Sequence, residues 1–370
     1  MHCRIKHIVR VLPLLAVLAS CTQWFDPEIN PPANVLAFEG LITNGPGPHY
    51  VKISRSAAYG SQAVFEPVSD ASVSVRNQYR ELIVFAEALP GTYYAPDGFS
   101  GVAGDTYTLY VDLPDGSSYR SGEQTLVDGL AANSVEAIFD GVEMPVENHL
   151  GQVNFQEVEG VKFFTDIENY RPEVPKVRFE TQLYVQYILE ELDTNMIPPV
   201  VPNDPMLMYC HRKLPLDRRV NVAIPPLEAG AGSSLRHELS FMPATIRFVA
   251  SMAVWQLRRI DRRAVIIRQF TLNDESYAFY RSLHDQMAAE GRIFDPVAAQ
   301  LQGNMVRTDK PGALVLGHFE ASYYHSATYL LNPEPITRQR LSIRPYENLD
   351  HLPVESVCYL EMRPPGWIFF

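Results

Sequence analysis

Short segments in which apolar and polar residues alternate dominate the sequence between residues 35 and 128. The alternation is partial over residues 35–43 and is repeated by Val73 and Val75, so every second side chain of an extended strand would lie on one face. Residues 114–116, Pro-Asp-Gly, form a turn signal. Short strands with turns about every 8–12 residues predict a mainly β chain that begins with a β-sandwich domain at residues 35–128.

A second β-rich domain is predicted for residues 129–370. The basic pairs Arg258-Arg259 and Arg262-Arg263 fall between two of its predicted strands. We interpret them as two solvated faces that meet at a hairpin turn, in preference to a binding patch. The strands predicted for this domain cover residues 161–167, 177–189, 220–224, 244–257, 260–272, 313–322 and 327–331.

One α-helix is predicted in this second domain, near residues 274–290. Aromatic and apolar residues recur at helical spacing over residues 277–287. Either Asn273 or Asp274 can cap its start, and Gly291 is placed to end it.

The first twenty residues have the layout of a secretory signal. Arg4, Lys6 and Arg10 precede an apolar run over residues 11–19, which is shorter than the roughly 20 residues that a membrane-spanning helix needs. The following Leu-Ala-Ser-Cys ends at Cys21 and resembles the lipobox of bacterial lipoproteins. In that family the cysteine is acylated and becomes the new N-terminus. A plain secretory cleavage site and a buried N-terminal strand are the alternatives.

The lipobox implies that residues 1–20 are removed and that Cys21 is the lipidation site. Residues 21–34 are rich in proline and would form a tether. Two or more acyl chains give stable membrane attachment, so the mature chain would need no transmembrane helix. Thr22 follows the cysteine, where an aspartate would favour inner-membrane retention. We therefore expect an outer-membrane location, on either the periplasmic or the cell-surface face.

The chain is acidic, with 31 Lys and Arg against 43 Asp and Glu. Removal of the signal takes away three basic residues, Arg4, Lys6 and Arg10, and no acidic one. Because affinity for phosphates depends on basic clusters, this balance argues against a nucleic-acid partner.

Two cysteines, Cys210 and Cys358, remain after Cys3 leaves with the signal and Cys21 is acylated. In an oxidising compartment a disulfide between them is reasonable. It would close a loop of roughly 150 residues, worth about 4–5 kcal/mol on the chain-entropy model. Buried free thiols and a metal pair remain alternatives, although the spacing is unlike that of a zinc site.

Two motifs in the first domain join glycine to tyrosine, Gly91-Thr92-Tyr93 and Gly104-Asp105-Thr106-Tyr107. With them, residues 67–119 resemble transthyretin-like and carboxypeptidase regulatory-like domains. Core packing alone also explains these tyrosines, and we favour it.

Several motifs recur in a characteristic order along the chain, at residues 38–44, 50–54, 277–280, 294–296, 303–304 and 315–319. Their order resembles a Bacteroidota lipoprotein family known as domain of unknown function 4249. The resemblance implies an outer-membrane lipoprotein that is often encoded beside a TonB-dependent receptor, without a known enzyme activity. It also implies that Cys210 and Cys358 are family cysteines, although a second cysteine expected near Cys358 is missing.

The sequence shows little catalytic chemistry, and we expect no cofactor. It lacks a His-Glu-x-x-His zinc motif and a Gly-x-Ser-x-Gly nucleophile elbow. His318 and His325 could form a metal pair, but packed or solvated side chains are the preferred interpretation. The candidates explained by ordinary structure are the glycine-rich loop 230–234, the turn at Asp112 and Asp115, and the exposed pair Glu190-Glu191. The proline-rich loop 198–205 is of a kind often used for contacts.

Three functions follow from these features. The first is a lipid-anchored accessory protein that partners a TonB-dependent receptor and helps to capture a nutrient. The second is a structural subunit of an envelope assembly. The third is a cell-surface hydrolase, which would need clustered carboxylates or a nucleophile that the sequence does not display.

Overall fold

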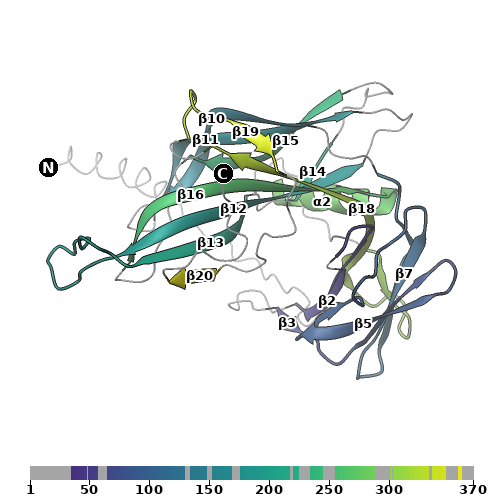
Figure 1. Cartoon of the computed structure of the whole chain (residues 1–370). Coiled ribbons are helices and arrows are strands. Elements are labelled where there is room, and N and C mark those ends of the chain that lie inside the picture. The colour runs from purple at the N-terminus through teal and green to yellow at the C-terminus, as the bar shows by residue number, and fades with distance from the viewer. Residues whose placement is uncertain are drawn as a thin grey trace, which may run out of the picture.

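The computed structural model describes residues 35–47, 49–56, 65–129, 134–147, 152–168, 176–216, 220–224, 234–244, 255–288, 301, 303–332, 336–346 and 357–360. Within them the chain is mainly β with one helix, α2, which confirms the predicted fold class (Figure 1). The predicted signal, Cys21 and the predicted tether lie outside the described residues.

The strands β1 to β9 form the N-terminal region, in which most pairs join strands that are close in the chain. Side chains of two sheets enclose one core, to which Phe38, Val51, Val75 and Leu109 contribute. The alternation in the sequence places these side chains inward. The resemblance to transthyretin-like domains stays a prediction. The strands are β1 (Leu36–Thr43), β2 (Tyr50–Arg55), β3 (Glu66–Pro67), β4 (Ser72–Asn77), β5 (Leu82–Leu89), β6 (Thr92–Tyr94), β7 (Thr106–Asp112), β8 (Ser118–Ser121) and β9 (Gln124–Thr125).

The central region has two facing sheets, with a three-stranded sheet above a sheet of more strands in Figure 1. Phe163 and Leu239 from the first sheet meet Leu183 and Val265 from the second in one core. The first sheet holds β10 (Val135–Glu147), β11 (Val153–Glu168) and β15 (Ser234–Pro243). The second includes β12 (Val177–Glu191), β13 (Leu207–Pro215), β14 (Asn221–Val222), β16 (Trp255–Thr271), β19 (Ile343–Pro345) and β20 (Val357–Leu360).

One strand, β18 (Leu316–Leu331), connects the two regions. Its first half pairs in parallel with β1, from Leu316 to Ser322, and its second half pairs antiparallel with β16, from Tyr323 to Leu331. The short strand β17 (Met305–Arg307) pairs with β8. Strand pairing therefore continues across the domain boundary predicted at residue 128.

Helix α2 (Asp274–Ala288) begins at the predicted place. Asn273 is the N-cap, because its Oδ1 accepts a hydrogen bond of 2.9 Å from the backbone N–H of Ser276, three residues into the turn. Asp274 and Glu275 lie in the first turn, where acidic side chains favour the helix dipole. Among the described residues, no helix combines the length and the apolar character that crossing a membrane would require.

The hairpin predicted at the arginine pairs is wrong. Arg258, Arg259, Arg262 and Arg263 all lie within the single strand β16, which runs beside β12. Arg263 is buried, so these arginines are not one solvated cluster. The two strands predicted over residues 313–331 are likewise one strand, β18.

The predicted disulfide is confirmed: Cys210 and Cys358 are bonded to each other. They lie directly opposite one another on β13 and β20. The bond therefore links β20 to β13 within the second sheet of the central region.

Candidate functional site

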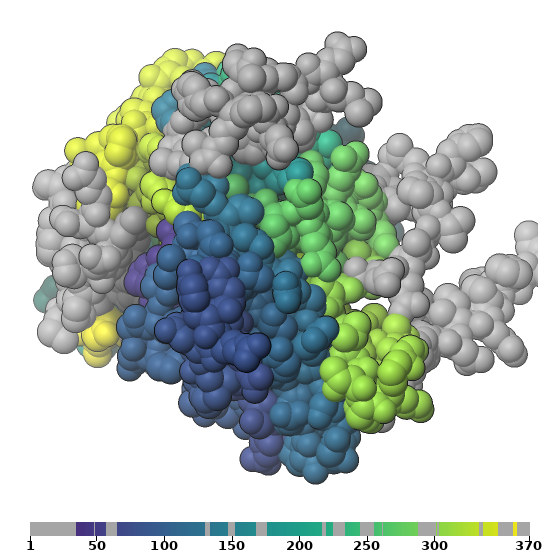
Figure 2. All heavy atoms as spheres, turned by 90° about the vertical axis from the view of Figure 1, so that its right-hand side faces the viewer, coloured from purple at the N-terminus to yellow at the C-terminus, as the bar shows by residue number. Residues whose placement is uncertain are grey.

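A pocket of about 420 Å³ lies where the N-terminal region, the central sheet and helix α2 meet. Figure 2 shows the blue N-terminal region directly against the green helix α2 and the yellow-green segment that holds β17. The pocket walls come from β1, β2, β12, β14, α2 and β18. Its volume is typical of small-molecule sites, which often form between structural units.

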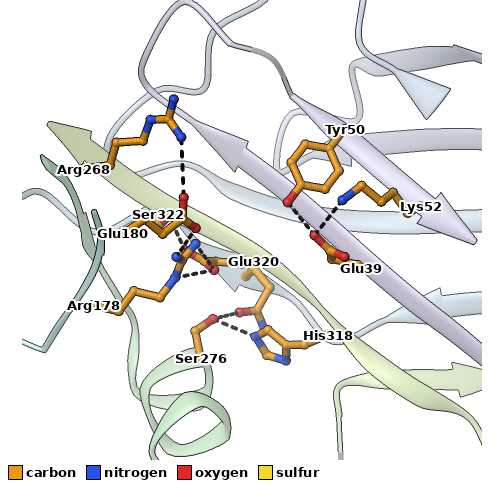
Figure 3. A network of polar contacts seen from close by, with 11 residues as sticks. Glu39, Tyr50, Lys52, Arg178, Glu180, Arg268, Ser276, His318, Glu320 and Ser322 are labelled. Atoms are coloured by element: carbon orange, nitrogen blue, oxygen red, sulfur yellow. Dashed lines mark hydrogen bonds and ion pairs between the residues drawn. The ribbon is translucent and has the colours of Figure 1, made fainter. Parts of the chain in front are cut away.

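A buried ion pair forms the back of the pocket (Figure 3). Arg178 of β12 donates to both carboxylate oxygens of Glu320 on β18, at 2.9 Å to 3.2 Å. The side chains of Arg178 and Glu320 are only 8% and 1% exposed. Arg178 also donates to Glu180 at 2.7 Å, and Ser322 donates to Glu320 at 2.5 Å. Every nitrogen of the guanidinium is therefore bound to a carboxylate.

Aromatic rings enclose this ion pair. The guanidinium carbon of Arg178 lies 3.7 Å from the centre of the Phe270 ring and 4.7 Å from that of Tyr280. Burial, followed by the charge of Glu320, raises the pKa of Tyr280 well above its usual value. Burial opposes the charge of Arg178, but the neighbouring Glu320 keeps the pKa of the guanidinium raised. Tyr280 is thus a neutral phenol and Arg178 a cation at neutral pH.

A second chain of hydrogen bonds fixes His318 on the pocket wall. The cap bond fixes the orientation of the Asn273 amide, so its nitrogen donates to Gln124 Oε1 at 2.9 Å. Ser276 Oγ donates to the same oxygen at 3.0 Å and lies 2.8 Å from His318 Nε2. Because the hydroxyl has one hydrogen, His318 Nε2–H must be the donor to Ser276.

His318 is neutral at this position. Burial, and then the charge of Arg178, lower the pKa of the imidazole to about 3. Its ring stacks on Phe279 at a centroid distance of 4.6 Å. Its Nδ1 is enclosed and has no hydrogen-bond partner within the described part of the chain.

The rim of the pocket carries an exposed polar group of residues from β1 and β2 (Figure 3). Glu39 Oε1 accepts from the Tyr50 hydroxyl at 2.6 Å and from Lys52 Nζ at 3.1 Å. The side chains of Lys52 and Glu39 are 49% and 60% exposed. Burial, followed by Glu39, raises the pKa of Tyr50, so its hydroxyl stays protonated and donates.

The histidines considered as a metal pair both lie on β18, and His325 is seven residues beyond His318. Strand geometry separates their backbones by roughly 23 Å, so they cannot share an ion. Among the described residues, no group of three or more His, Cys, Asp or Glu side chains is arranged to hold a metal.

The other sequence candidates lie away from the pocket. Glu190 is not exposed charge, because it is mostly covered and pairs with Arg258 at 3.6 Å. Asp115 accepts from the backbone N–H of Ser117 within the predicted turn, and Asp112 accepts from Ser118. The glycine-rich loop lies outside the described residues, apart from its last residue, Ser234.

The central ion pair was not predicted from the sequence. Arg178 and Glu320 each interrupt an apolar strand, Val177-Arg178-Phe179 and Phe319-Glu320-Ala321. A charge flanked by apolar residues in a strand buried on both faces needs a partner, and that signal could have identified both residues.

Four of the six segments on which the family resemblance depends meet at this pocket. Residues 38–44, 50–54, 277–280 and 315–319 each supply part of its lining, for example Glu39, Tyr50, Tyr280 and His318. Segments more than 200 residues apart in the chain thus converge on one site.

One family model, described as "Domain of unknown function (DUF4249)", matches residues 22–328 of the chain. The matched range contains every residue that lines the pocket. No curated protein and no solved structure matches the chain.

Proposed function

Since the chain belongs to the family described as Domain of unknown function (DUF4249), we propose that it is a lipid-anchored outer-membrane accessory protein that binds a solute in the junction pocket and works beside a TonB-dependent receptor. The observation that carries the proposal is the pocket itself. Its walls are fixed by Arg178, Glu320 and His318, which form hydrogen bonds with other residues of the protein. Preorganised walls lower the free-energy cost of binding.

The geometry favours binding over hydrolysis. Ser276 and His318 are within hydrogen-bond reach, as in a nucleophile–base pair. However, Ser276 is fully buried, and its hydroxyl hydrogen is directed at Gln124. The histidine donates to the serine and therefore cannot act as its base in this arrangement.

The tip of the β12–β13 hairpin is a candidate surface for the receptor. This tip, residues 192–206, contains the predicted contact loop and projects at the far left of Figure 1. Ile197 is 98% exposed, and Met196 and Val200 are also largely uncovered. Exposed apolar groups gathered at one place often mark a protein interface.

A pull-down from native membranes in mild detergent tests the partnership. We expect one TonB-dependent receptor to co-purify with the tagged protein and to be lost, by about tenfold or more, in Ile197→Asp. Val102→Asp is the matched control, because Val102 is also exposed but lies in the N-terminal region.

The same experiment separates the alternatives. Enrichment of envelope-assembly proteins in place of the receptor would favour the structural role. Equal receptor recovery from Ile197→Asp would show that the hairpin tip is not the contact surface. Recovery of no receptor from cells that produce it would refute the proposed partnership.

The lipid anchor has a separate test. We expect Cys21→Ser to abolish acylation and to leave residues 1–20 attached, because both acylation and cleavage at the lipobox depend on this cysteine. Mass spectrometry of the wild-type N-terminal peptide should show a chain that begins at acylated Cys21. A wild-type chain that begins at another residue, without lipid, would refute the anchor.

A further inference from the structure

Every charged group that lines the junction pocket already has a partner of opposite charge. The lining contains Glu39, Glu180 and Glu320 and one cation, Arg178. Arg178 pairs with both Glu320 and Glu180. From just outside the lining, Lys52 pairs with Glu39 at 3.1 Å, and Arg268 lies 3.8 Å from Glu180. Three carboxylates are thus matched by three cations.

This balance disfavours a charged ligand. An anion would have to compete with carboxylates for Arg178, Lys52 or Arg268, and it would face three negative groups. A cation would have to share Glu39 with Lys52, or Glu180 with Arg178 and Arg268. The Arg178–Glu320 pair is buried, and breaking it would leave an uncompensated charge, which is costly.

The rim nevertheless keeps unused hydrogen-bonding capacity. Glu39 accepts both of these hydrogen bonds at Oε1, and among the described residues Oε2 has no hydrogen-bond partner. Lys52 Nζ carries three hydrogens and uses one of them on Glu39. Adjacent donors and acceptors of this kind match hydroxyl groups, which donate and accept at once.

Apolar surface lies beside these polar groups. Phe279, Tyr280 and Tyr50 contribute to the lining. An aromatic wall next to a charge-balanced polar rim fits a molecule with a hydrocarbon face and hydroxyl edges. We infer that the junction pocket binds an uncharged polyhydroxylated ligand of the carbohydrate class. This inference rests on the proposed binding role of the pocket, but not on the receptor.

Calorimetry with sugar series that differ only in charge tests the inference. The probes are glucose, galactose and mannose, each with its amino-sugar and its uronic acid, and disaccharides of the neutral sugars. They are titrated into the full mature protein in mild detergent. We expect at least one neutral series member to bind, about tenfold or more tighter than its charged counterparts.

Two substitutions at the rim should shift the preference for charged sugars in opposite directions. Glu39→Gln keeps a hydrogen-bond acceptor for Tyr50 but leaves Lys52 without its carboxylate, so the uronic acid should gain affinity relative to the neutral sugar. Lys52→Gln leaves Glu39 unpaired, so the amino-sugar should gain instead. The control is Glu136→Gln, because the Glu136–Arg236 pair is similarly exposed, at 57% and 49%, and lies on β10 and β15.

Several outcomes would overturn the inference. These are equal or tighter binding of a charged sugar to the wild type, no binding of any neutral probe up to millimolar concentration, and the same shift in Glu136→Gln as in Glu39→Gln. None of these outcomes changes the result expected from the receptor pull-down. A failed sugar titration with successful co-purification would refute the ligand class alone, whereas sugar binding without a receptor would refute only the partnership.

Discussion

The N-terminal and central regions are both built from β-strands, but they close their sheets over very different distances in the chain. In the N-terminal region Val73 pairs with Phe85, across one tight turn. In the central region Val177 pairs with Thr271, and Cys210 with Cys358. Closing a longer loop loses more chain entropy. The central region should therefore depend more strongly on each link that holds distant segments together.

The disulfide gives the largest expected effect. Replacing both Cys210 and Cys358 by serine should lower the free energy of unfolding by about 4–5 kcal/mol, because a bond across 148 residues restricts the unfolded chain. Hydrogen exchange followed by mass spectrometry should show lost protection in β13 and β12, with β4 and β7 little changed. Equal loss in both regions would show that they unfold as one unit.

Substitutions in the buried ion pair measure how much it stabilises the junction between the two regions. Glu320→Ala should destabilise the protein by roughly 3–5 kcal/mol, because Arg178 would remain buried without its main counter-charge. The double variant Arg178→Met, Glu320→Leu should recover much of that loss, since no charge is left unpaired. Urea unfolding of both single variants and the double variant measures the coupling. A loss below about 1 kcal/mol in Glu320→Ala would mean that water reaches Arg178.

The two regions also differ in how well the sequence predicts them. In the N-terminal region, short strands with one buried face show the alternation directly, as in β7, where Tyr107, Leu109 and Val111 are buried. In the central region β12 is buried on both faces over residues 183–186, so the two-residue period disappears. The arginines of β16 suggested a turn, but the strand continues through them. Its pairing with β12 shifts register twice in this part of the ladder.

The pocket could not be predicted from local sequence patterns, for a related reason. Its lining depends on which distant strands become neighbours, and no local pattern states that β18 pairs with β1. His318 is packed, which is one of the two environments favoured for it from the sequence, whereas no role was predicted for Arg178. The family resemblance included four segments that line the pocket, because it depends on the order of motifs along the chain and not on local periodicity.

A substitution at Gly317 tests whether the close approach of β18 to β1 is required for stability. Its φ is +96°, and a Cβ there would lie 1.8 Å from the carbonyl oxygen of Phe38. Gly317→Ala should therefore cost about 3 kcal/mol, from an unfavourable backbone and a backbone clash. Gly312→Ala is the control, since its φ is +82° but nothing lies within 4 Å, and about 1–2 kcal/mol is expected. Equal losses on thermal unfolding would mean that β1 can move away.

The pH dependence of stability should report on His318. Its pKa is about 3 in the folded protein and near 6.5 when unfolded, because burial and then Arg178 disfavour the charged ring. The folded state is thus favoured above pH 6.5 and loses stability as the pH falls toward 3. Between pH 7 and 5 the loss should be about 2 kcal/mol. His318→Gln can keep the donor to Ser276, and it should remove this part of the pH dependence; an unchanged slope would assign it to other groups.

The smallest effect concerns the cap that joins helix α2 to the N-terminal region. Asn273→Ala removes the bond to the Ser276 N–H and a donor to Gln124, so a loss of about 1 kcal/mol is expected. Asp274→Ala is the control, because Asp274 is exposed and its partner Lys176 is on the surface. Hydrogen exchange distinguishes two cases. Faster exchange confined to α2 would mean that the cap serves only the helix. Faster exchange in β9 as well, through Gln124, would mean that the short strands of the N-terminal region depend on a long-range link after all, as the central region does.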